Sequence, residues 1–143
     1  DFQSNMTVDG MPGASLRVWR DYFKNAQIYG ADIDKDILFQ EDRIKTYYVD
    51  QLNTPSIETM WKNIGIHNFD IIIDDGSHLF NDQVKSFGIL KNKMKSDGIY
   101  IIEDVNDIDS KKQNFINLHP NSEIIDNRHI KNRSDDVLIL YKF

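Results

Sequence analysis

The chain has 143 residues, a formal net charge of −6 at pH 7 and no cysteine, with 40% hydrophobic and 28% charged residues. This length suits one domain with a real core, and the lack of cysteine excludes a disulfide scaffold and a thiolate metal site. The excess of acid argues against a nucleic-acid partner, and the absence of a signal-peptide pattern or a bilayer-length apolar run predicts a cytoplasmic protein without a membrane partner.

The first part of the chain predicts a helix, two strands and a second helix. Apolar residues recur at helical spacing over residues 16–23, which indicates an amphipathic helix. Residues 44–49 are rich in β-branched and aromatic side chains, and residues 27–32 contain Ile28 and Tyr29 in a short run that ends on Asp32, so we expect a strand in each. Ser56 is the expected N-cap of a helix that ends near Gly65.

The second part of the chain continues the alternation of strands and helices. Residues 69–74 give the strongest strand pattern, and their continuous apolar run predicts a strand buried on both faces. A helix is expected over 81–94 and another buried strand over 98–102. A polar helix at 111–118 and closing strands at 123–125 and 137–141 complete the pattern. The alternation predicts an α/β fold with a mostly parallel sheet and helices on both faces.

Acidic residues stand at the carboxyl end of each of the earlier predicted strands. Ligands of open parallel sheets bind outside the carboxyl ends of the strands, so we expect these acids to gather along one edge. The alternative is that such acids simply N-cap the helices that follow. The acids are Asp32, Asp50, the pair Asp74 and Asp75, and the pair Glu103 and Asp104.

The acids after the two most apolar strands have the composition of a metal site. Carboxylates from Asp75, Glu103 and Asp104 suit a hard divalent cation such as Mg²⁺, which keeps positions open for water or substrate. His78 follows Asp75 by three residues and is the residue type best suited to accept a proton near neutral pH. The competing interpretations are a helix cap for Asp75 and an ordinary loop imidazole for His78.

Five motifs follow one another along the chain: GASLRVWRDYF, NAQIYGADID, VDQ, FDIIIDDGSH and GIYIIEDV. Together they resemble class I S-adenosylmethionine-dependent methyltransferases, and the resemblance runs from about residue 12 to residue 141. Within that class the chain is most similar to the metal-dependent sugar O-methyltransferases of macrolide biosynthesis, the mycinamicin type. Proteins labelled cephalosporin hydroxylase share the same pattern of strand ends. The resemblance implies a Rossmann-like sandwich of strand order 3-2-1-4-5-7-6 with an antiparallel last strand.

The resemblance also implies a reaction and a set of site residues. The reaction is methyl transfer from S-adenosylmethionine to a hydroxyl of a sugar or glycosylated small molecule. His78 would be the catalytic base, and Asp75, Glu103 and Asp104 would hold Mg²⁺. The residues expected to bind the cofactor are Ser15 at the first helix, Asp32 at the ribose, Asp50 and Gln51 near the adenosine, and Asp74.

The beginning of the chain departs from the family pattern. The family cradles the methionine end of the cofactor in a glycine-rich loop after its first strand, and residues 1–13 do not match that loop. We therefore expect residues 1–143 to be a single methyltransferase domain without its first strand, in which 1–13 are a loop remnant before the first helix. Two alternatives remain. One is a non-methylating relative with the same metal site at the strand ends, and the other is a catalytically silent interaction module. The sequence leaves open the acceptor and the oligomeric state, a homo-oligomer included.

Overall fold

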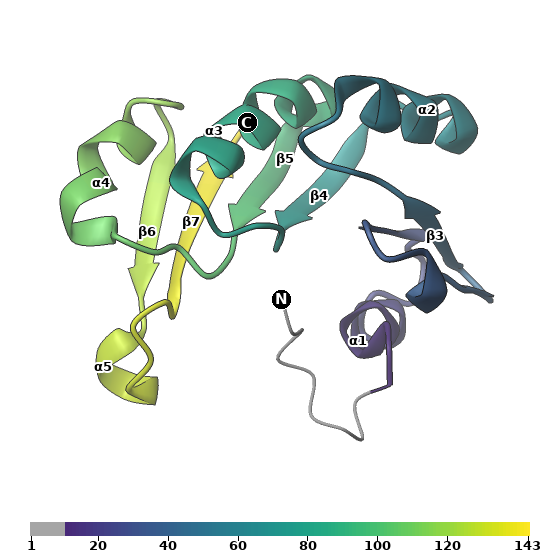
Figure 1. Ribbon diagram of the computed structural model, residues 1–143, viewed down its shortest axis with the longest axis horizontal. Coiled ribbons are helices and arrows are strands. Elements are labelled where there is room, and N and C mark those ends of the chain that lie inside the picture. The colour runs from purple at the N-terminus through teal and green to yellow at the C-terminus, as the bar shows by residue number, and fades with distance from the viewer. Residues whose placement is uncertain (1–10) are drawn as a thin grey trace. The chain divides into compact units, whose positions relative to one another are not determined.

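A computed structural model describes residues 11–143 and divides the chain into two compact units between Asn63 and Ile64 (Figure 1). The loop predicted at residues 1–13 falls largely outside the described part of the chain, and its last residues lead directly into the first helix. Over residues 11–143, every helix is too short or too polar to span a bilayer.

The first unit is a three-stranded sheet with two helices. The strand order is β1-β3-β2, in which β1 and β3 run parallel and the short β2 is antiparallel to β3. The parallel pair confirms two strands predicted from the sequence, whereas β2 and a short 3₁₀ turn were not predicted. The elements are α1 (Ala14–Tyr22), β1 (Ile28–Asp32), η1 (Lys35–Ile37), β2 (Gln40–Glu41), β3 (Ile44–Tyr48) and α2 (Thr54–Ile64).

Glycine allows α1 to pack closely on this sheet. A Cβ atom added to Gly30 in β1 would lie 2.6 Å from Cδ1 of Leu16, so the absence of a side chain there makes room for the apolar face of α1. Gly13, directly before α1, has a φ of +78°, and a Cβ atom there would overlap the Phe39 ring. Gly13 therefore requires glycine because of its positive φ, whereas a side chain at Gly30 would force the Leu16 side chain to move.

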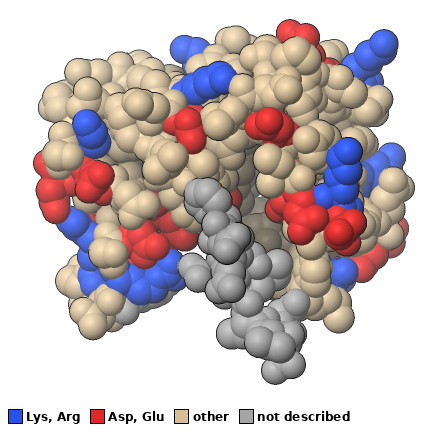
Figure 2. Space-filling view, in the orientation of Figure 1, with Lys and Arg blue, Asp and Glu red and all other residues tan. Residues whose placement is uncertain are grey.

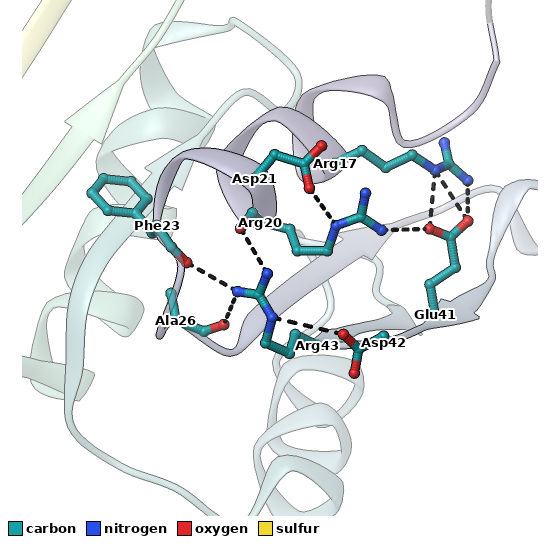
Figure 3. Close-up of polar contacts among 8 residues, drawn as sticks. All are labelled: Arg17, Arg20, Asp21, Phe23, Ala26, Glu41, Asp42 and Arg43. Carbon is teal, nitrogen blue, oxygen red and sulfur yellow. Dashed lines mark hydrogen bonds and ion pairs between the residues drawn. The ribbon is translucent and has the colours of Figure 1, made fainter.

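Arginine side chains fasten the end of α1 to the β2–β3 hairpin (Figure 3). The Arg43 guanidinium donates to the main-chain carbonyls of Arg20 at 3.0 Å, Phe23 at 3.0 Å and Ala26 at 3.2 Å. Arg17 donates to Glu41 in β2 at 2.6 Å. Carbonyls at a helix C-terminus have no partner within the helix, so a single planar side chain here satisfies several backbone acceptors.

The second unit is a four-stranded sheet of order β4-β5-β7-β6. β4 and β5 are parallel, whereas β7 is antiparallel to both β5 and β6. The elements are β4 (Phe69–Asp74), α3 (Phe80–Leu90), η2 (Lys91–Lys93), β5 (Met94–Ile102), α4 (Ile108–Ile116), β6 (Ser122–Asp126), α5 (Arg128–Lys131) and β7 (Val137–Lys142).

Aromatic side chains of this sheet and of the helices α3 and α4 form much of the core of the second unit. Phe87 of α3 is 1% exposed and contacts Tyr100 of β5 edge-on, with ring centroids 5.1 Å apart. Tyr141 of β7 lies 4.4 Å from the Phe87 ring and donates its hydroxyl to the main-chain carbonyl of Phe115 in α4 at 3.0 Å. The buried hydroxyl is thus paired, as the cost of burying an unpaired polar group requires.

The strand orders fit the Rossmann-like methyltransferase fold implied by the motifs. Numbering the strands as that fold does, β1 and β3 are strands 2 and 3, and β4, β5, β7 and β6 follow as strands 4-5-7-6. The antiparallel last strand is confirmed by the pairing of β7 with both of its neighbours. The described residues contain no strand in the position of strand 1.

Two details of the sequence prediction are wrong. The helix expected over 81–94 ends at Leu90, because Met94 pairs with Phe69 as the start of β5. Ser56 lies inside α2, which begins at Thr54. The cap position falls instead to Asn53, whose side chain accepts from the main-chain N–H of Ser56 at 3.3 Å.

The expectation that β4 is buried on both faces is also wrong. Ile71 is 39% exposed, and of the six residues of the strand only Asp74 is buried. β4 is an edge strand of its sheet, and α3 and α4 supply core residues on one face only. A continuous apolar run therefore does not by itself establish burial on two faces.

Replacing Phe87 by alanine should lower the free energy of unfolding by about 3–5 kcal/mol, because it empties the centre of the aromatic core. Urea unfolding followed by circular dichroism measures this change. Ile130→Ala, at a side chain 69% exposed, is the matched control and should change stability by no more than about 0.5 kcal/mol. Equal losses in the two variants would contradict the assigned core.

Arg43→Lys should destabilise the chain by roughly 1–3 kcal/mol, since an ammonium group cannot reach three carbonyls in one plane. Asp42→Asn serves as the control because the Asp42 side chain is 91% exposed and its ion pair with Arg43 is 3.8 Å long. The same urea titration applies, and a lysine variant as stable as the parent would show that the carbonyl contacts contribute little.

Candidate metal and active site

The parallel pairing of β4 and β5 brings two acidic segments to one edge of the sheet. Asp74 is in register with Ile102, and the main-chain N–H of Glu103 donates to the Asp74 carbonyl at 3.0 Å. The segments that begin with Asp75 and Glu103 therefore leave the sheet side by side. This arrangement confirms the expectation that these strand ends meet.

Three side chains of these segments form a compact cluster. Candidate ligand atoms of Asp75, His78 and Asp104 all lie within 4.8 Å of one another. His78 Nε2 is 3.0 Å from Asp75 Oδ1. His78 and Asp104 have φ angles of +57° and +49°, a left-handed conformation that is uncommon for residues other than glycine. Such conformations persist only where surrounding contacts hold them, and they often mark functional sites.

Hydrogen bonds hold the two loops that carry the cluster. Ser77 Oγ donates to Asp82 in the first turn of α3 at 2.6 Å. The side-chain amide of Asn106 donates to the His78 carbonyl at 3.4 Å, which joins the loop after β5 to the loop after β4.

Gln83 supports the site from beneath and was missed by the sequence analysis. It is 1% exposed, and its Nε2 donates to the main-chain carbonyl of Glu103 at 3.3 Å. The signal was a polar residue within the apolar stripe that Phe80, Phe87 and Leu90 form on α3. A buried amide at such a position needs a polar partner, and here the partner is the site's own backbone.

The electrostatics of the cluster favour a bound cation. Burial raises the pKa of the Asp104 carboxyl, and the nearby charges of Asp135 and Asp75 raise it further, against the opposing effects of His78 and Arg133. Burial likewise raises the pKa of Glu103, with repulsion from Asp75 and Asp104 adding to it. Ionising these carboxylates together is therefore costly without a positive charge between them.

The donor chemistry of the cluster fits a divalent metal. Two carboxylates suit Mg²⁺, and an added imidazole is also acceptable to Mn²⁺ and other transition metals. Glu103 does not belong to the compact group, although it is half-buried and within electrostatic reach of Asp75 and Asp104. The predicted metal role of Glu103 and the predicted base role of His78 both stay predictions.

Asp74 points into the protein and is 8% exposed. Its Oδ2 accepts from the Tyr100 hydroxyl at 3.1 Å, and its carboxylate also accepts from the Gly76 main-chain N–H. Burial raises the pKa of this carboxyl. These contacts favour a role in holding the turn that contains Asp75, and the expected contact of Asp74 with the cofactor stays a prediction.

The first unit carries the other predicted acids at one edge of its own sheet. Asp32 ends β1, and its main-chain carbonyl accepts from Val49 N–H at 2.8 Å. Asp50 follows Val49, and its carboxylate accepts from the Leu52 N–H at 2.9 Å. The main-chain N–H of Asp50 donates to Ser56 Oγ at 3.0 Å. Asp32 and Asp50 are thus neighbours at the strand ends, as expected.

An open depression of about 320 Å³ lies next to Ser56, whose Oγ accepts from the Asp50 N–H. The depression is lined by Tyr48, Asn53, Pro55, Ser56 and Thr59.

The other residues predicted to bind the cofactor are also in the first unit. Ser15 lies in the first turn of α1 and is exposed, and Gln51 is half-buried in the loop after β3. The cofactor contacts of Ser15, Asp32, Asp50 and Gln51 stay predictions.

Curated O-methyltransferases are similar to about two thirds of this chain. A tetracenomycin-C rhamnosyl 2′-O-methyltransferase of Streptomyces olivaceus is 37% identical over 93 residues, which are 65% of this chain and 24% of the relative. Mycinamicin VI 2″-O-methyltransferase of Micromonospora griseorubida is 39% identical over 93 residues, 65% of this chain and 23% of the relative. The chain thus spans about a quarter of the length of the curated relatives it matches. No protein-family model matches it.

Solved structures of MycE, a methyltransferase of the mycinamycin biosynthetic pathway, are similar in fold. A complex of MycE with Mg and SAH matches with a TM-score of 0.70 and 25% identity, over 97% of this chain and 42% of MycE. A complex that also holds mycinamycin VI matches with a TM-score of 0.56 and 37% identity, over 64% of this chain and 23% of MycE. The fold is therefore that of a Rossmann-like methyltransferase. The predicted resemblance is confirmed, and this chain is a relative of the sugar O-methyltransferases of macrolide and tetracenomycin pathways.

Asp104→Asn should raise the thermal stability of the metal-free chain at pH 7, by roughly 1–3 °C. The folded state raises the pKa of Asp104 above its ordinary 3.8, so the ionised carboxylate destabilises the folded chain at neutral pH and the protonated one does not. The gain should therefore shrink as the pH falls through the raised pKa, and vanish below about 3.8.

Differential scanning fluorimetry with a chelator present, repeated between pH 3.5 and 8, measures this gain. Glu58→Gln, at an exposed position of α2, is the control variant. A stability difference that did not change with pH would argue that Asp104 carries no unfavourable charge in the folded chain.

Proposed function

We propose that the protein containing this chain transfers a methyl group from S-adenosylmethionine to a hydroxyl of a sugar or glycosylated small molecule, with the help of Mg²⁺. The observation that carries the proposal is the cluster of Asp75, His78 and Asp104 at the carboxyl edge of a methyltransferase sheet. The names of the relatives support the reaction, and the Mg and SAH in the MycE complexes support the two cofactors. We further propose that both units are parts of one catalytic domain.

The acids at the end of the β4–β5 pair would hold the metal. Asp75 and Asp104 provide the ligand atoms of the compact cluster, and Glu103 would complete the carboxylate set. When bound, a divalent cation supplies Lewis acidity that lowers the pKa of an acceptor hydroxyl. The raised pKa values of Glu103 and Asp104 support this assignment, because a cation would relieve the cost of ionising both groups.

His78 would act as the general base. Asp75 lies 3.0 Å from His78 Nε2, so it favours the tautomer in which Nε2 carries the proton and Nδ1 keeps a free lone pair. As the acceptor oxygen forms its bond to the methyl carbon and the carbon–sulfur bond breaks, the hydroxyl proton passes to His78. The products are a methyl ether, S-adenosylhomocysteine and the protonated imidazole, whose charge Asp75 stabilises.

Residues of the first unit would bind the methyl donor. Asp32 would accept hydrogen bonds from the ribose hydroxyls, and Asp50 and Gln51 would lie near the adenosine. The first turn of α1 at Ser15 has free main-chain N–H groups that can receive the methionine carboxylate. Asp74 would contribute indirectly, because its hydrogen bonds support the turn that contains Asp75.

In the full-length protein, His78→Ala should lower kcat by about 10²–10⁴-fold, since removing a general base typically costs this much. Product formation from labelled S-adenosylmethionine measures the rate. His129→Ala is the matched control because His129 is exposed on α5, and it should keep the parent activity. A His78→Ala variant with parental turnover would exclude His78 as the base.

Asp75→Asn should act on metal binding, so excess Mg²⁺ should restore part of its activity, whereas a chelator should abolish the activity of the parent protein. Activity that survives the chelator would contradict the metal site.

Calorimetry with S-adenosylhomocysteine checks the cofactor separately. If the full-length protein does not bind it, the alternative of a non-methylating enzyme with the same metal edge is favoured.

A further inference from the structure

A cationic side chain already lies beside the proposed metal site. The Arg133 guanidinium is 3.5 Å from Asp104 Oδ2, and its Nε donates to Asp135 Oδ1 at 3.3 Å. Arg133 follows α5 in the segment between β6 and β7, where Figure 2 shows basic side chains bordering acidic ones. Arg133 therefore bridges one carboxylate of the cluster and one carboxylate outside it.

The backbone holds Arg133 in this place. The main-chain N–H of Val105, next to Asp104, donates to the Val137 carbonyl at the start of β7 at 3.1 Å. The N–H of Asn127 donates to the Asp136 carbonyl at 2.9 Å and closes the segment that contains α5. The ends of this segment are thus joined to each other and to the residue after Asp104, which keeps Arg133 within reach of the cluster.

We propose that Arg133 supplies the counter-charge of the cluster in the metal-free protein and competes with the divalent cation for Asp104. This inference rests on the proposed function, because it concerns the same metal site. On metal binding, Arg133 would give up Asp104 and keep Asp135. The exchange costs little free energy because Arg133 keeps its pair with Asp135, and no charge is left unpaired when Asp104 turns to the metal.

The contact lengths support exchange over a permanent pair. At 3.5 Å, the Arg133–Asp104 pair is a single loose contact, and the Arg133 side chain is 52% exposed. Arg128 lies five residues before Arg133 and makes a different kind of contact, with hydrogen bonds of 2.7–3.0 Å to both Asp109 and Asp126. Arg128 is thus held by several short hydrogen bonds, whereas Arg133 has single, longer contacts with two carboxylates, which suits the proposed exchange.

Metal affinity is the measurement that tests this role. Mn²⁺ binding to the 143-residue chain, followed by electron paramagnetic resonance, should be about two- to five-fold tighter in Arg133→Gln than in the parent chain. Arg128→Gln, which removes the same charge from the same segment, should leave the affinity unchanged. Asp135→Asn should weaken binding, because Arg133 then has only Asp104 as a partner.

The outcomes separate the inference from the proposed function. Parental or weaker Mn²⁺ affinity in Arg133→Gln overturns the competition, even where the parent binds the metal well. An equal gain in Arg128→Gln also overturns it, since the effect would then be one of net charge alone. If the parent and all variants fail to bind Mn²⁺, the proposed metal site itself is wrong and the inference falls with it. If Arg133→Gln does not fold, Arg133→Lys provides the test. A smaller gain in Mn²⁺ affinity is then expected, because lysine keeps the positive charge and loses only the planar guanidinium.

Discussion

The parallel pairing of β4 with β5 is the constraint on which the candidate site depends. It sets Asp74 opposite Ile102, so the chain leaves both strands at the same edge and the residues that follow meet there. Asp75, His78 and Asp104 come together only because of this register. A shift of one residue in either strand would turn alternate side chains to the other face and separate the cluster.

The site gathers negative charge at a partly buried edge, and the surrounding structure is arranged to hold it. Below the edge, the Tyr100 hydroxyl and the Gly76 N–H hold the Asp74 carboxylate, and Gln83 holds the backbone of Glu103. Beside it, Arg133 balances part of the charge. A bound divalent cation would balance the rest, which links the electrostatics of the cluster to the function we propose.

The order of elements and the chemistry of the strand ends could be read from the sequence. Hydrophobic periodicity located α1, α2 and the six longer strands, because these patterns depend on local spacing. The short β2, the end of α3 at Leu90 and the role of Asn53 depend on partners distant in the chain or on competing caps, and were missed. The exposure of Ile71 was missed for a similar reason, since an apolar run carries no information on what covers each face.

The sequence by itself determined the α/β class, the acids at the strand ends and the resemblance to sugar O-methyltransferases, because residue type and spacing suffice for these. Only the tertiary structure decided which of those acids meet. It joined Asp75 and Asp104 with His78, turned Asp74 toward Tyr100, and brought in Gln83 and Arg133 from other elements. The physical reason is that side-chain direction and long-range pairing are set by sheet register and packing, which no local pattern specifies.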